Sequence, residues 1–357
     1  MKILGIETSC DETAAAVVEE VDDPARPWVT RSSVVASQVE IHREWGGVVP
    51  EIASRQHVRD ICGVVERAMA DAAVTSADLG AIAVTQGPGL VGSLLVGVSF
   101  AKSLAAAWGL PIVAVHHLAG HIESLFLQHG PLPLPAMVLV VSGGHTSLYD
   151  VRTPGHYRAI GRTRDDAAGE AYDKVARLLG LGYPGGPIID RLAKGANDRA
   201  VEFPTARMTH PDRNQPLQKG QWDFSFSGLK TAVLRYVRAQ GERWQPSPRE
   251  IADICASFQR SVVGALVDKT FAAARWYGAR SVGIAGGVSA NSRLRADAIA
   301  AGERAGLPVF VPTIALSTDN AAMIAAAGLR RFHAGVRADL TLNADPALRL
   351  EDVVSSQ

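Results

Sequence analysis

The sequence predicts an α/β protein made of two similar units that face each other across a central cleft. Three observations lead to this prediction. The chain has 357 residues, which is more than one hydrophobic core usually holds. A proline-rich joint at residues 131–135 divides it. On each side of the joint the same order recurs: a hairpin, a third strand, a helix, a strand, a helix, a strand and a helix.

The first half begins with a short apolar run that predicts a buried strand, followed by a polar turn at residues 8–13 and a second apolar run. Residues 51–73 carry apolar side chains at helical spacing. A glycine-rich loop at residues 87–93 opens the next helix. The predicted strands are residues 2–7, 14–20, 28–38, 81–85 and 111–115, and the predicted helices are residues 51–73, a helix ending near 108, and one carrying His117 and His121.

The second half repeats this order and adds an insertion at residues 181–224, whose glycine, proline and asparagine content predicts irregular structure. We expect one domain at residues 1–133, joined by a C-terminal helix at about 325–357, and another at residues 134–324. The predicted strands are residues 136–141, 147–151, 157–163, 282–285 and 309–312. The predicted helices are residues 165–179, 227–238, 248–276 and 292–305, and one from Asp319 to just before Arg330.

Duplicated units of this kind form the layout of the actin-like, ribonuclease H-like superfamily of ATPases and sugar kinases. In that layout the nucleotide phosphates lie between two hairpin turns, which here are residues 8–13 and 142–146. The architecture leaves the chemistry open, because one fold hosts many functions.

Composition excludes several classes of protein. Lys+Arg and Asp+Glu are both 36 and 47% of residues are hydrophobic, so the chain is neither disordered nor basic overall, and a nucleic-acid partner would need a local patch. Three scattered cysteines argue against a disulfide framework. The start Met-Lys predicts no signal peptide. The apolar run at residues 90–116 contains Lys102 and breaks at glycine and proline, so we expect a cytoplasmic enzyme with no membrane contact.

A pair of histidines, His117 and His121, follows a predicted strand. Residues four apart share one face of a helix, so the two imidazoles form half of a metal site, and Asp319 is the candidate third ligand. Two histidines and a carboxylate leave open positions, as a catalytic metal requires. The simpler interpretations are hydrogen-bonded helix histidines and a helix N-cap at Asp319.

Several loops carry residues suited to anion or nucleotide binding. Adjacent glycines in the turn at residues 142–146 can present backbone N–H groups to a phosphate, or form an ordinary hairpin turn. Asn291, after a glycine pair, faces a nucleotide or caps a helix. Asp190 offers a carboxylate to a ribose hydroxyl, or is an exposed helix aspartate. Glu12, near the first turn, is a candidate base or an exposed acid. Ser227 is expected to cap the helix that follows it.

Taken together, the motifs resemble those of the bacterial tRNA threonylcarbamoyladenosine transferases, the TsaD family once described as glycoproteases. The resemblance covers residues 3–324 in order. The matching segments are residues 5–13, 46–51, 87–92, 116–121, 141–146, 165–170, 183–187, 224–231, 285–291 and 318–320. Two features depart from the family pattern: Ala119 stands where many members have glutamate, and the segment at residues 200–222 is longer than in several relatives.

The resemblance implies an actin-like fold and one divalent metal per subunit, usually Fe²⁺ with zinc or manganese as alternatives, held by His117, His121 and Asp319. It implies transfer of threonylcarbamoyl from threonylcarbamoyl-AMP to N6 of the adenosine just 3′ of the anticodon (adenosine 37), in tRNAs reading codons that begin with adenine. TsaB-like and TsaE-like proteins are the implied partners. The implied substrate-binding residues are Val140, Val141, Ser142, Gly143, Gly144, Asp173, Gly186, Asp190 and Asn291.

Other functions fit parts of the same pattern. A metallopeptidase needs a general base beside the histidines, and no HExxH motif is present. A non-catalytic actin-like scaffold need not keep the histidines, and a sugar kinase or ATPase would share the fold. Arg152, Arg158, Arg162 and Arg164 cluster in sequence; a solvated face is the simpler interpretation of that cluster, and a tRNA contact is the alternative.

Overall fold

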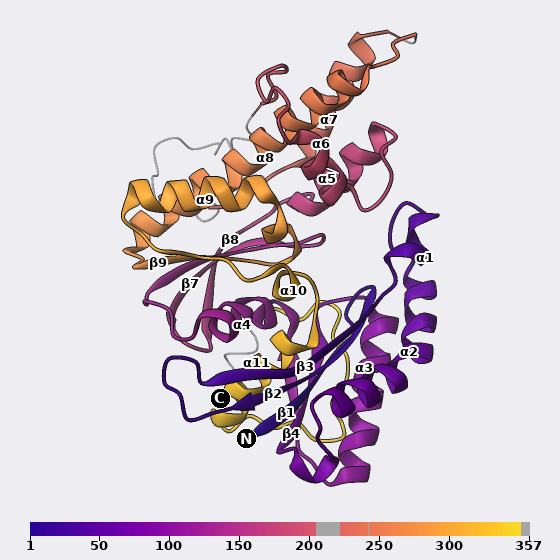
Figure 1. Cartoon of the computed structure of the whole chain (residues 1–357), viewed down its shortest axis with the longest axis vertical. Helices are drawn as coiled ribbons and strands as arrows, with labels where there is room; N and C mark the ends of the chain where they lie inside the picture. The colour runs from indigo at the N-terminus through magenta and orange to yellow at the C-terminus, as the bar shows by residue number, and fades with distance from the viewer. Residues whose placement is uncertain (205–221, 242, 351–357) are drawn as a thin grey trace. The chain divides into compact units, whose positions relative to one another are not determined.

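The computed structural model describes residues 1–204, 222–241 and 243–350, which divide into two compact units (Figure 1). Unit 1 consists of residues 1–132, residues 153–157 and the described chain from Pro312 onward. Unit 2 consists of the described parts of residues 133–152 and 158–311.

Unit 1 is built on a five-stranded sheet in the order β3-β2-β1-β4-β5. The central strand β1 pairs antiparallel with β2 and parallel with β4. Its apolar side chains are fully buried, as expected for a strand covered on both faces. The strands are β1 (Lys2–Glu7), β2 (Glu12–Glu20), β3 (Trp28–Ser37), β4 (Ala81–Gly87) and β5 (Ile112–His116).

Helices cover both faces of this sheet. α2 (Pro50–Asp71) and α3 (Val91–Trp108) share one hydrophobic core with it. α11 (Ala321–His333) packs on β1, and α4 (His117–His129) packs on α11. Gly5 permits the close approach of α11, because a Cβ there would lie 2.3 Å from the carbonyl oxygen of Ala321. The short helices are α1 (Val39–Arg43), η1 (Ser76–Asp78) and α10 (Ile314–Ser317).

Among the described helices, α3 alone is long and apolar enough to cross a membrane. Core helices of globular proteins pass the same test. The Nζ atom of Lys102 donates a hydrogen bond to the carbonyl oxygen of Leu342 (3.1 Å), and the helix ends at Gly109 in the left-handed conformation (φ 66°). These contacts are those of a helix packed within unit 1, as the sequence predicts.

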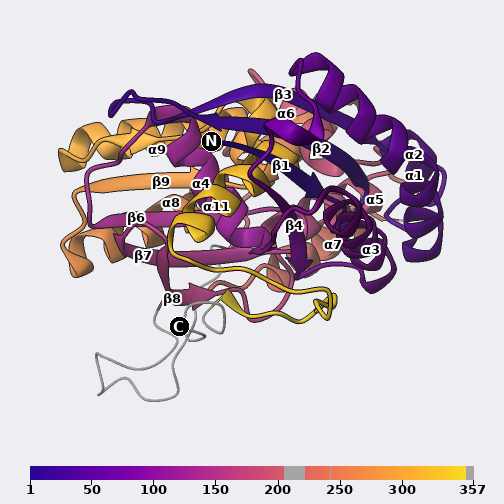
Figure 2. The same ribbon diagram turned by 90° about the horizontal axis from the view of Figure 1, so that it is seen from below.

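Unit 2 has a sheet in the order β10-β9-β6-β7-β8, and β9, β6, β7 and β8 can be followed in Figure 2. β6 pairs antiparallel with β7 and parallel with β9, just as β1 pairs with β2 and β4. The predicted duplicated α/β fold is therefore confirmed. The strands are β6 (Ala136–Val141), β7 (Thr146–Thr153), β8 (His156–Arg162), β9 (Ser281–Ala285) and β10 (Val309–Phe310).

The helices of unit 2 bury one face of the sheet in a core that includes Leu139, Leu148 and Phe258. They are α5 (Ala168–Leu178), α6 (Gly185–Ala193), α7 (Ser227–Ala239), α8 (Pro248–Tyr277), η2 (Gly287–Ala290) and α9 (Ser292–Ala305). The prediction that residues 181–224 are irregular is wrong for α6. Within that insertion, residues 205–221, and with them most of the long 200–222 segment, lie outside the described residues.

The predicted cap of α7 is also wrong. Ser227 is the first residue of α7 and does not occupy the N-cap position. That position belongs to Phe226, whose side chain makes no capping hydrogen bond. The carboxylate of Asp165 accepts hydrogen bonds from the backbone N–H groups of Phe226 (2.8 Å) and Ser227 (3.3 Å). An aspartate distant in sequence satisfies the unpaired donors at this helix start, which local sequence patterns do not reveal.

Candidate metal centre and nucleotide-binding loops

Two histidines project from the first turns of α4. The helix begins at His117, directly after β5, because the Nδ1 atom of His116 accepts a hydrogen bond from the backbone N–H of Leu118 (3.1 Å) and caps it. His117 and His121 lie on one helix face with ring centroids 4.7 Å apart, and both are buried. The strand and cap therefore fix where both imidazoles point.

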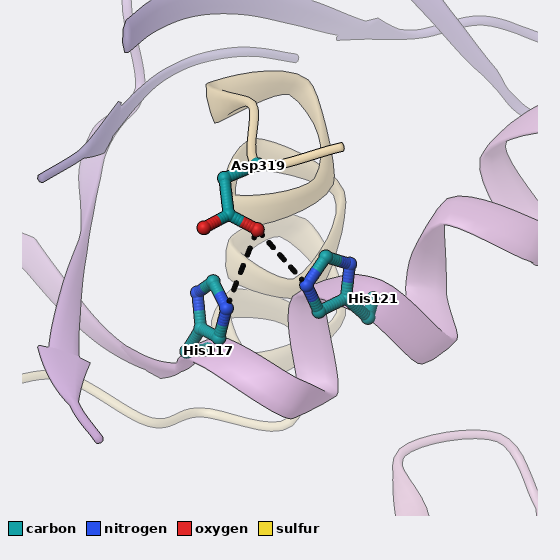
Figure 3. A group of neighbouring side chains, drawn as sticks. All are labelled: His117, His121 and Asp319. Carbon is teal, nitrogen blue, oxygen red and sulfur yellow. Dashed lines mark ion pairs between the residues drawn. The ribbon is translucent and has the colours of Figure 1, made fainter. Parts of the chain in front are cut away.

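Asp319 lies between α10 and α11 and faces the same point. Its Oδ1 atom is 3.2 Å from Nε2 of His121 and 3.6 Å from Nε2 of His117 (Figure 3). The interpretation of Asp319 as an N-cap is wrong, because α11 begins at Ala321 and Asn320 caps it by accepting from the N–H of Met323 (3.0 Å). α11 also runs to His333, past the predicted end before Arg330, whereas the helix expected at about 325–357 is wrong for residues 334–349, which are not helical. The carboxylate of Asp319 is left to face the histidines.

A second carboxylate, which the sequence analysis missed, orients His117. The Oε2 atom of Glu7 lies 3.1 Å from Nδ1 of His117 and accepts a hydrogen bond from the hydroxyl of Thr85 (2.7 Å). The Oγ atom of Ser9 lies 3.2 Å from the same ring nitrogen. A carboxylate at Nδ1 holds a proton there and directs Nε2 toward Asp319, which is how histidine ligands of metals are commonly oriented.

The charges around this group shift its pKa values. Burial by itself lowers the pKa of His117, but the negative charges of Asp319 and Glu7 outweigh burial and raise it to about 9. Burial lowers the pKa of His121. Burial would raise the pKa of Glu7, yet the charge of His117 and its hydrogen bond hold that pKa below the usual range. When no cation is bound, the positive charge of protonated His117 offsets part of the negative charge of Glu7 and Asp319.

The donor set fits a divalent cation. Two imidazole nitrogens and one carboxylate oxygen lie within 4.8 Å of one another. Among the described residues, Nδ1 of His121 has no hydrogen-bond partner and Nε2 faces the carboxylate of Asp319, and a buried polar atom without a partner is costly. Imidazole and carboxylate together suit iron, zinc or manganese and leave positions open for substrate.

Glu12 is the first residue of β2 and is only partly buried. Its Oε1 atom accepts a hydrogen bond from the hydroxyl of Ser37 (3.4 Å). Burial, together with the charges of Asp11 and Asp319, raises the pKa of Glu12 well above its usual range. The negative charge of Asp319 therefore contributes to the raised pKa of Glu12.

In unit 2, the turn after β6 exposes backbone rather than side chains. Val140 and Val141 are fully buried in β6, directly before the turn. The N–H of Ser142 donates to the carbonyl oxygen of His145 (2.8 Å). Gly143 and Gly144 are exposed, with open space where a Cβ would stand. An anion could approach their N–H groups closely.

The structure brings Asp190 and Asn291 together. Asp190 accepts hydrogen bonds from the N–H (3.1 Å) and hydroxyl (2.8 Å) of Ser292, the residue after Asn291. The Oδ1 atom of Asn291 accepts from the N–H of Leu294 (2.9 Å) and caps α9. The capping interpretation of Asn291 is therefore confirmed. Its Nδ2 atom donates to Gln259 (2.7 Å), a positioning contact that the sequence analysis missed.

Asp173 and Gly186 also come together in unit 2. The Oδ1 atom of Asp173 accepts a hydrogen bond from the N–H of Gly185 (2.7 Å) at the start of α6. Gly186 follows with open space around its Cα. The negative charge of Asp173 stabilises the N-terminus of α6, and Gly186, which is partly exposed, adds no side chain there.

Sequence comparison relates nearly the whole chain to one family. A sequence model of TsaD, tRNA N6-adenosine threonylcarbamoyltransferase, matches residues 29–326. A curated relative of that name from Anaeromyxobacter dehalogenans (strain 2CP-C) is 54% identical over 350 residues, which cover 98% of this chain and 99% of that protein. Another from Moorella thermoacetica (strain ATCC 39073 / JCM 9320) is 53% identical over 348 residues, covering 98% and 97%.

Solved structures with similar folds are more distant in sequence. Full-length HypF in its phosphate- and nucleotide-bound form superposes with a TM-score of 0.57 at 14% identity, over 93% of this chain and 46% of HypF. The (R)-2-hydroxyglutaryl-CoA dehydratase component A of Acidaminococcus fermentans gives a TM-score of 0.50 at 14% identity, over 92% and 96%. At this identity the likeness shows the fold alone, which is actin-like.

Proposed function

We propose that this chain, which belongs to the tRNA N6-adenosine threonylcarbamoyltransferase family, transfers threonylcarbamoyl from threonylcarbamoyl-AMP to N6 of adenosine 37, in tRNAs reading codons that begin with adenine. The observation that carries this proposal is the full-length match to relatives of that name at 50–54% identity. In the reaction the adenine amine attacks the carbamoyl carbon and loses a proton. The bond from that carbon to the phosphate oxygen breaks, and AMP leaves.

The residues of unit 2 are suited to hold the AMP group. In this proposal the N–H groups of Gly143 and Gly144 bind the phosphate, whose negative charge grows as it leaves. Asp190 accepts a hydrogen bond from a ribose hydroxyl, and Asn291 and Asp173 position the helix starts around the nucleotide. Gly186 keeps the N-terminus of α6 open. Val140 and Val141, which are fully buried in β6, are proposed to hold this turn in position.

The metal site is proposed to hold one divalent ion, Fe²⁺ first, with zinc and manganese as alternatives. His117, His121 and Asp319 are the proposed ligands. A bound divalent ion supplies Lewis-acid polarisation of a carbonyl oxygen. Glu7 keeps the proton of His117 on Nδ1 and so leaves Nε2 for the metal. Glu12, whose raised pKa favours its protonated form, is proposed to exchange a proton with the reacting amine.

TsaB-like and TsaE-like proteins are proposed as partners, and the cytoplasm as the location. Threonylcarbamoyl-AMP would come from a separate synthase that activates threonine and bicarbonate with ATP. No observation favours a metallopeptidase or a non-catalytic scaffold, because neither would account for the family relationship over the full chain.

The test is a reconstituted reaction containing this chain, a threonylcarbamoyl-AMP synthase, the two partners, ATP, threonine, bicarbonate and unmodified tRNA. Nucleosides from the digested tRNA are then analysed by mass spectrometry. We expect threonylcarbamoyladenosine only when this chain is present. Equal product in reactions that omit the chain, or no product with every component present, would contradict the proposed function.

Asp190→Ala is expected to raise the Kd for AMP about tenfold, because a hydrogen bond from a neutral hydroxyl to a charged carboxylate contributes about 1.4 kcal/mol. Isothermal titration calorimetry measures this change. Asp297→Ala is the matched control, since it removes a carboxylate of α9 that pairs only with Arg293 in the same unit. Unchanged affinity in Asp190→Ala would count against the proposed ribose contact.

A further inference from the structure

A strip of arginines follows the edge of the unit 2 sheet. β8 is the edge strand, and Arg158 and Arg162 are four residues apart on it, so both point to the same face, about 13 Å apart along the strand. Arg164 follows β8, and Arg152 lies near the end of the adjacent strand β7. All four arginines are exposed.

Largely buried carboxylates pair with three of these arginines, and the strip keeps a net positive charge. Asp150, whose side chain is 1% exposed, pairs with both Arg152 (2.9 Å) and Arg158 (2.8 Å). Asp223 pairs with Arg164. The guanidinium groups stay half exposed, at 58%, 59% and 51% of the side chain. No ion pair of Arg162 is present within the described ranges. Four arginines therefore face two largely buried carboxylates, and positive charge remains at the surface.

Aromatic rings lie beside this strip. The guanidinium of Arg158 stacks over the ring of Tyr277, with 5.1 Å to the centroid. Trp222 packs against Tyr277 (6.2 Å between centroids) and Trp276 (6.4 Å). Trp276 is 54% exposed. Rings with an open face among arginines suit unstacked bases, since bases stack on aromatic side chains while cations hold the phosphates.

The strip also begins beside the proposed phosphate-binding turn. The N–H of Thr163, next to Arg162, donates to the carbonyl oxygen of Thr146 (2.8 Å), and the N–H of Ala168 donates to the hydroxyl of the same threonine (2.9 Å). Thr146 follows the turn that contains Gly143 and Gly144. All of these residues belong to unit 2.

We propose that this strip (Arg152, Arg158, Arg162 and Arg164, with Trp276) is a contact surface for tRNA. The arginines would bind backbone phosphates, Trp276 would stack with an unpaired base, and the strip would lead single-stranded nucleotides toward the turn at residues 142–146. This inference rests on the proposed function for the choice of tRNA as the nucleic acid. It locates the tRNA on unit 2 of a chain whose net charge is zero, through a local patch.

A structural explanation competes with this proposal. Charged side chains on an edge strand also prevent edge-to-edge aggregation, and charge of either sign serves that purpose. Charge reversal therefore separates the two explanations. If the arginines only protect the edge, a glutamate variant stays soluble and binds tRNA as before; if they bind phosphates, the glutamate variant loses tRNA affinity. Arg162 is the best position, because its replacement leaves the carboxylates of Asp150 and Asp223 paired with the other three arginines.

The experiment measures binding of the full-length chain to an unmodified transcript of a tRNA reading codons that begin with adenine, across a series of salt concentrations. We expect Arg162→Glu to raise Kd about tenfold and to lower the slope of log Kd against log salt by about 0.7 to 0.9. Arg162→Lys should restore most of the slope. Arg304→Glu is the matched control, since this exposed arginine ends α9, which packs on β10 at the opposite edge of the same sheet.

Trp276 adds a separate readout. Trp276→Ala is expected to raise Kd with an unchanged salt slope, and Trp276→Phe to bind as the parent does, because stacking needs a ring and not a charge. The proposed tRNA surface is wrong if Arg162→Glu and Arg304→Glu both keep the parent's Kd and salt slope, or if the parent binds no tRNA.

Transfer assays distinguish this inference from the proposed function. If the parent forms threonylcarbamoyladenosine and Arg162→Glu does so with an unchanged KM for tRNA, the surface is wrong and the function stands. If tRNA binding depends on Arg162 but the parent forms no product in the complete reaction, the surface stands and the function is wrong.

Discussion

Replacing Asp319 with alanine is expected to abolish stoichiometric metal binding and to lower threonylcarbamoyl transfer by at least about 100-fold. The carboxylate is the one acidic member of the three-donor group, and losing even a residue that only orients a ligand commonly costs 10- to 100-fold in metal affinity. Two neutral imidazoles would remain, with no negative charge directly opposite them. Metal content by elemental analysis and product by nucleoside mass spectrometry measure the two effects.

The neighbouring residue provides a control with the opposite profile. Asn320 caps α11 through the N–H of Met323, so Asn320→Ala should lower the free energy of unfolding by about 1 kcal/mol and still bind one metal. Asp319→Ala removes no cap of α11, but it removes a charge that stabilises protonated His117, so the metal-free variant should also be less stable than the parent at pH 7. Metal binding is therefore the measurement that separates the two variants. The prediction is wrong if Asp319→Ala retains a full equivalent of metal and normal transfer, or if Asn320→Ala loses metal while Asp319→Ala does not.

This pair of residues also shows where sequence reasoning succeeds and where it stops. The repeated order of apolar runs predicts both sheets, because burial on two faces forces continuous apolar strands. The four-residue spacing of His117 and His121 predicts that the two side chains share a face. The choice between Asp319 and Asn320 as the cap of α11 depends on where the first helical turn begins, and a shift of one residue moves the cap from one to the other. Local propensity does not resolve such a shift.

Apart from the approach of Asp319 to the two histidines, contacts between distant segments were not predicted. Glu7 reaches His117 across 110 residues of sequence, and Asp165 reaches the start of α7 across about 60. The one available signal for Glu7 is a charged residue at the end of an otherwise apolar, fully buried strand, because a buried carboxylate requires a partner. A helix at Asp190 was predicted and is confirmed, but the surrounding insertion was predicted to be irregular because glycine and proline at the start of α6 resemble a loop, although proline is favoured in the first turn of a helix.

The affinity of the site for a divalent metal is expected to rise steeply with pH up to about 9. The pKa of His117 in the metal-free chain is about 9, so at neutral pH the imidazole carries a proton, whereas a ligand imidazole must have a free nitrogen. Metal and proton therefore compete. The apparent Kd should fall about tenfold per pH unit, or roughly 100-fold from pH 7 to pH 9, and level off above. A competition titration against a chelator of known pH dependence measures it.

The stability of the metal-free chain should change in the opposite direction. A histidine whose pKa is raised on folding, here from 6.5 to about 9, contributes stability that is complete below its unfolded pKa and is lost as pH rises through its folded pKa. The contribution of His117 is on the order of 3 kcal/mol, so between pH 7 and pH 9 the metal-free chain should lose stability while added metal stabilises it increasingly. Denaturant unfolding at both pH values, with and without metal, measures the two trends.

Asp319→Asn tests the cause of this behaviour. The amide keeps the size of the side chain and removes the charge that, with Glu7, raises the pKa of His117. The pH dependence of metal-free stability should therefore shrink in this variant. A Kd for metal that stays constant from pH 7 to pH 9 in the parent chain would show that no proton is displaced from His117. The two carboxylates would then not hold this imidazole in its charged form, and the electrostatic account of the site would fail.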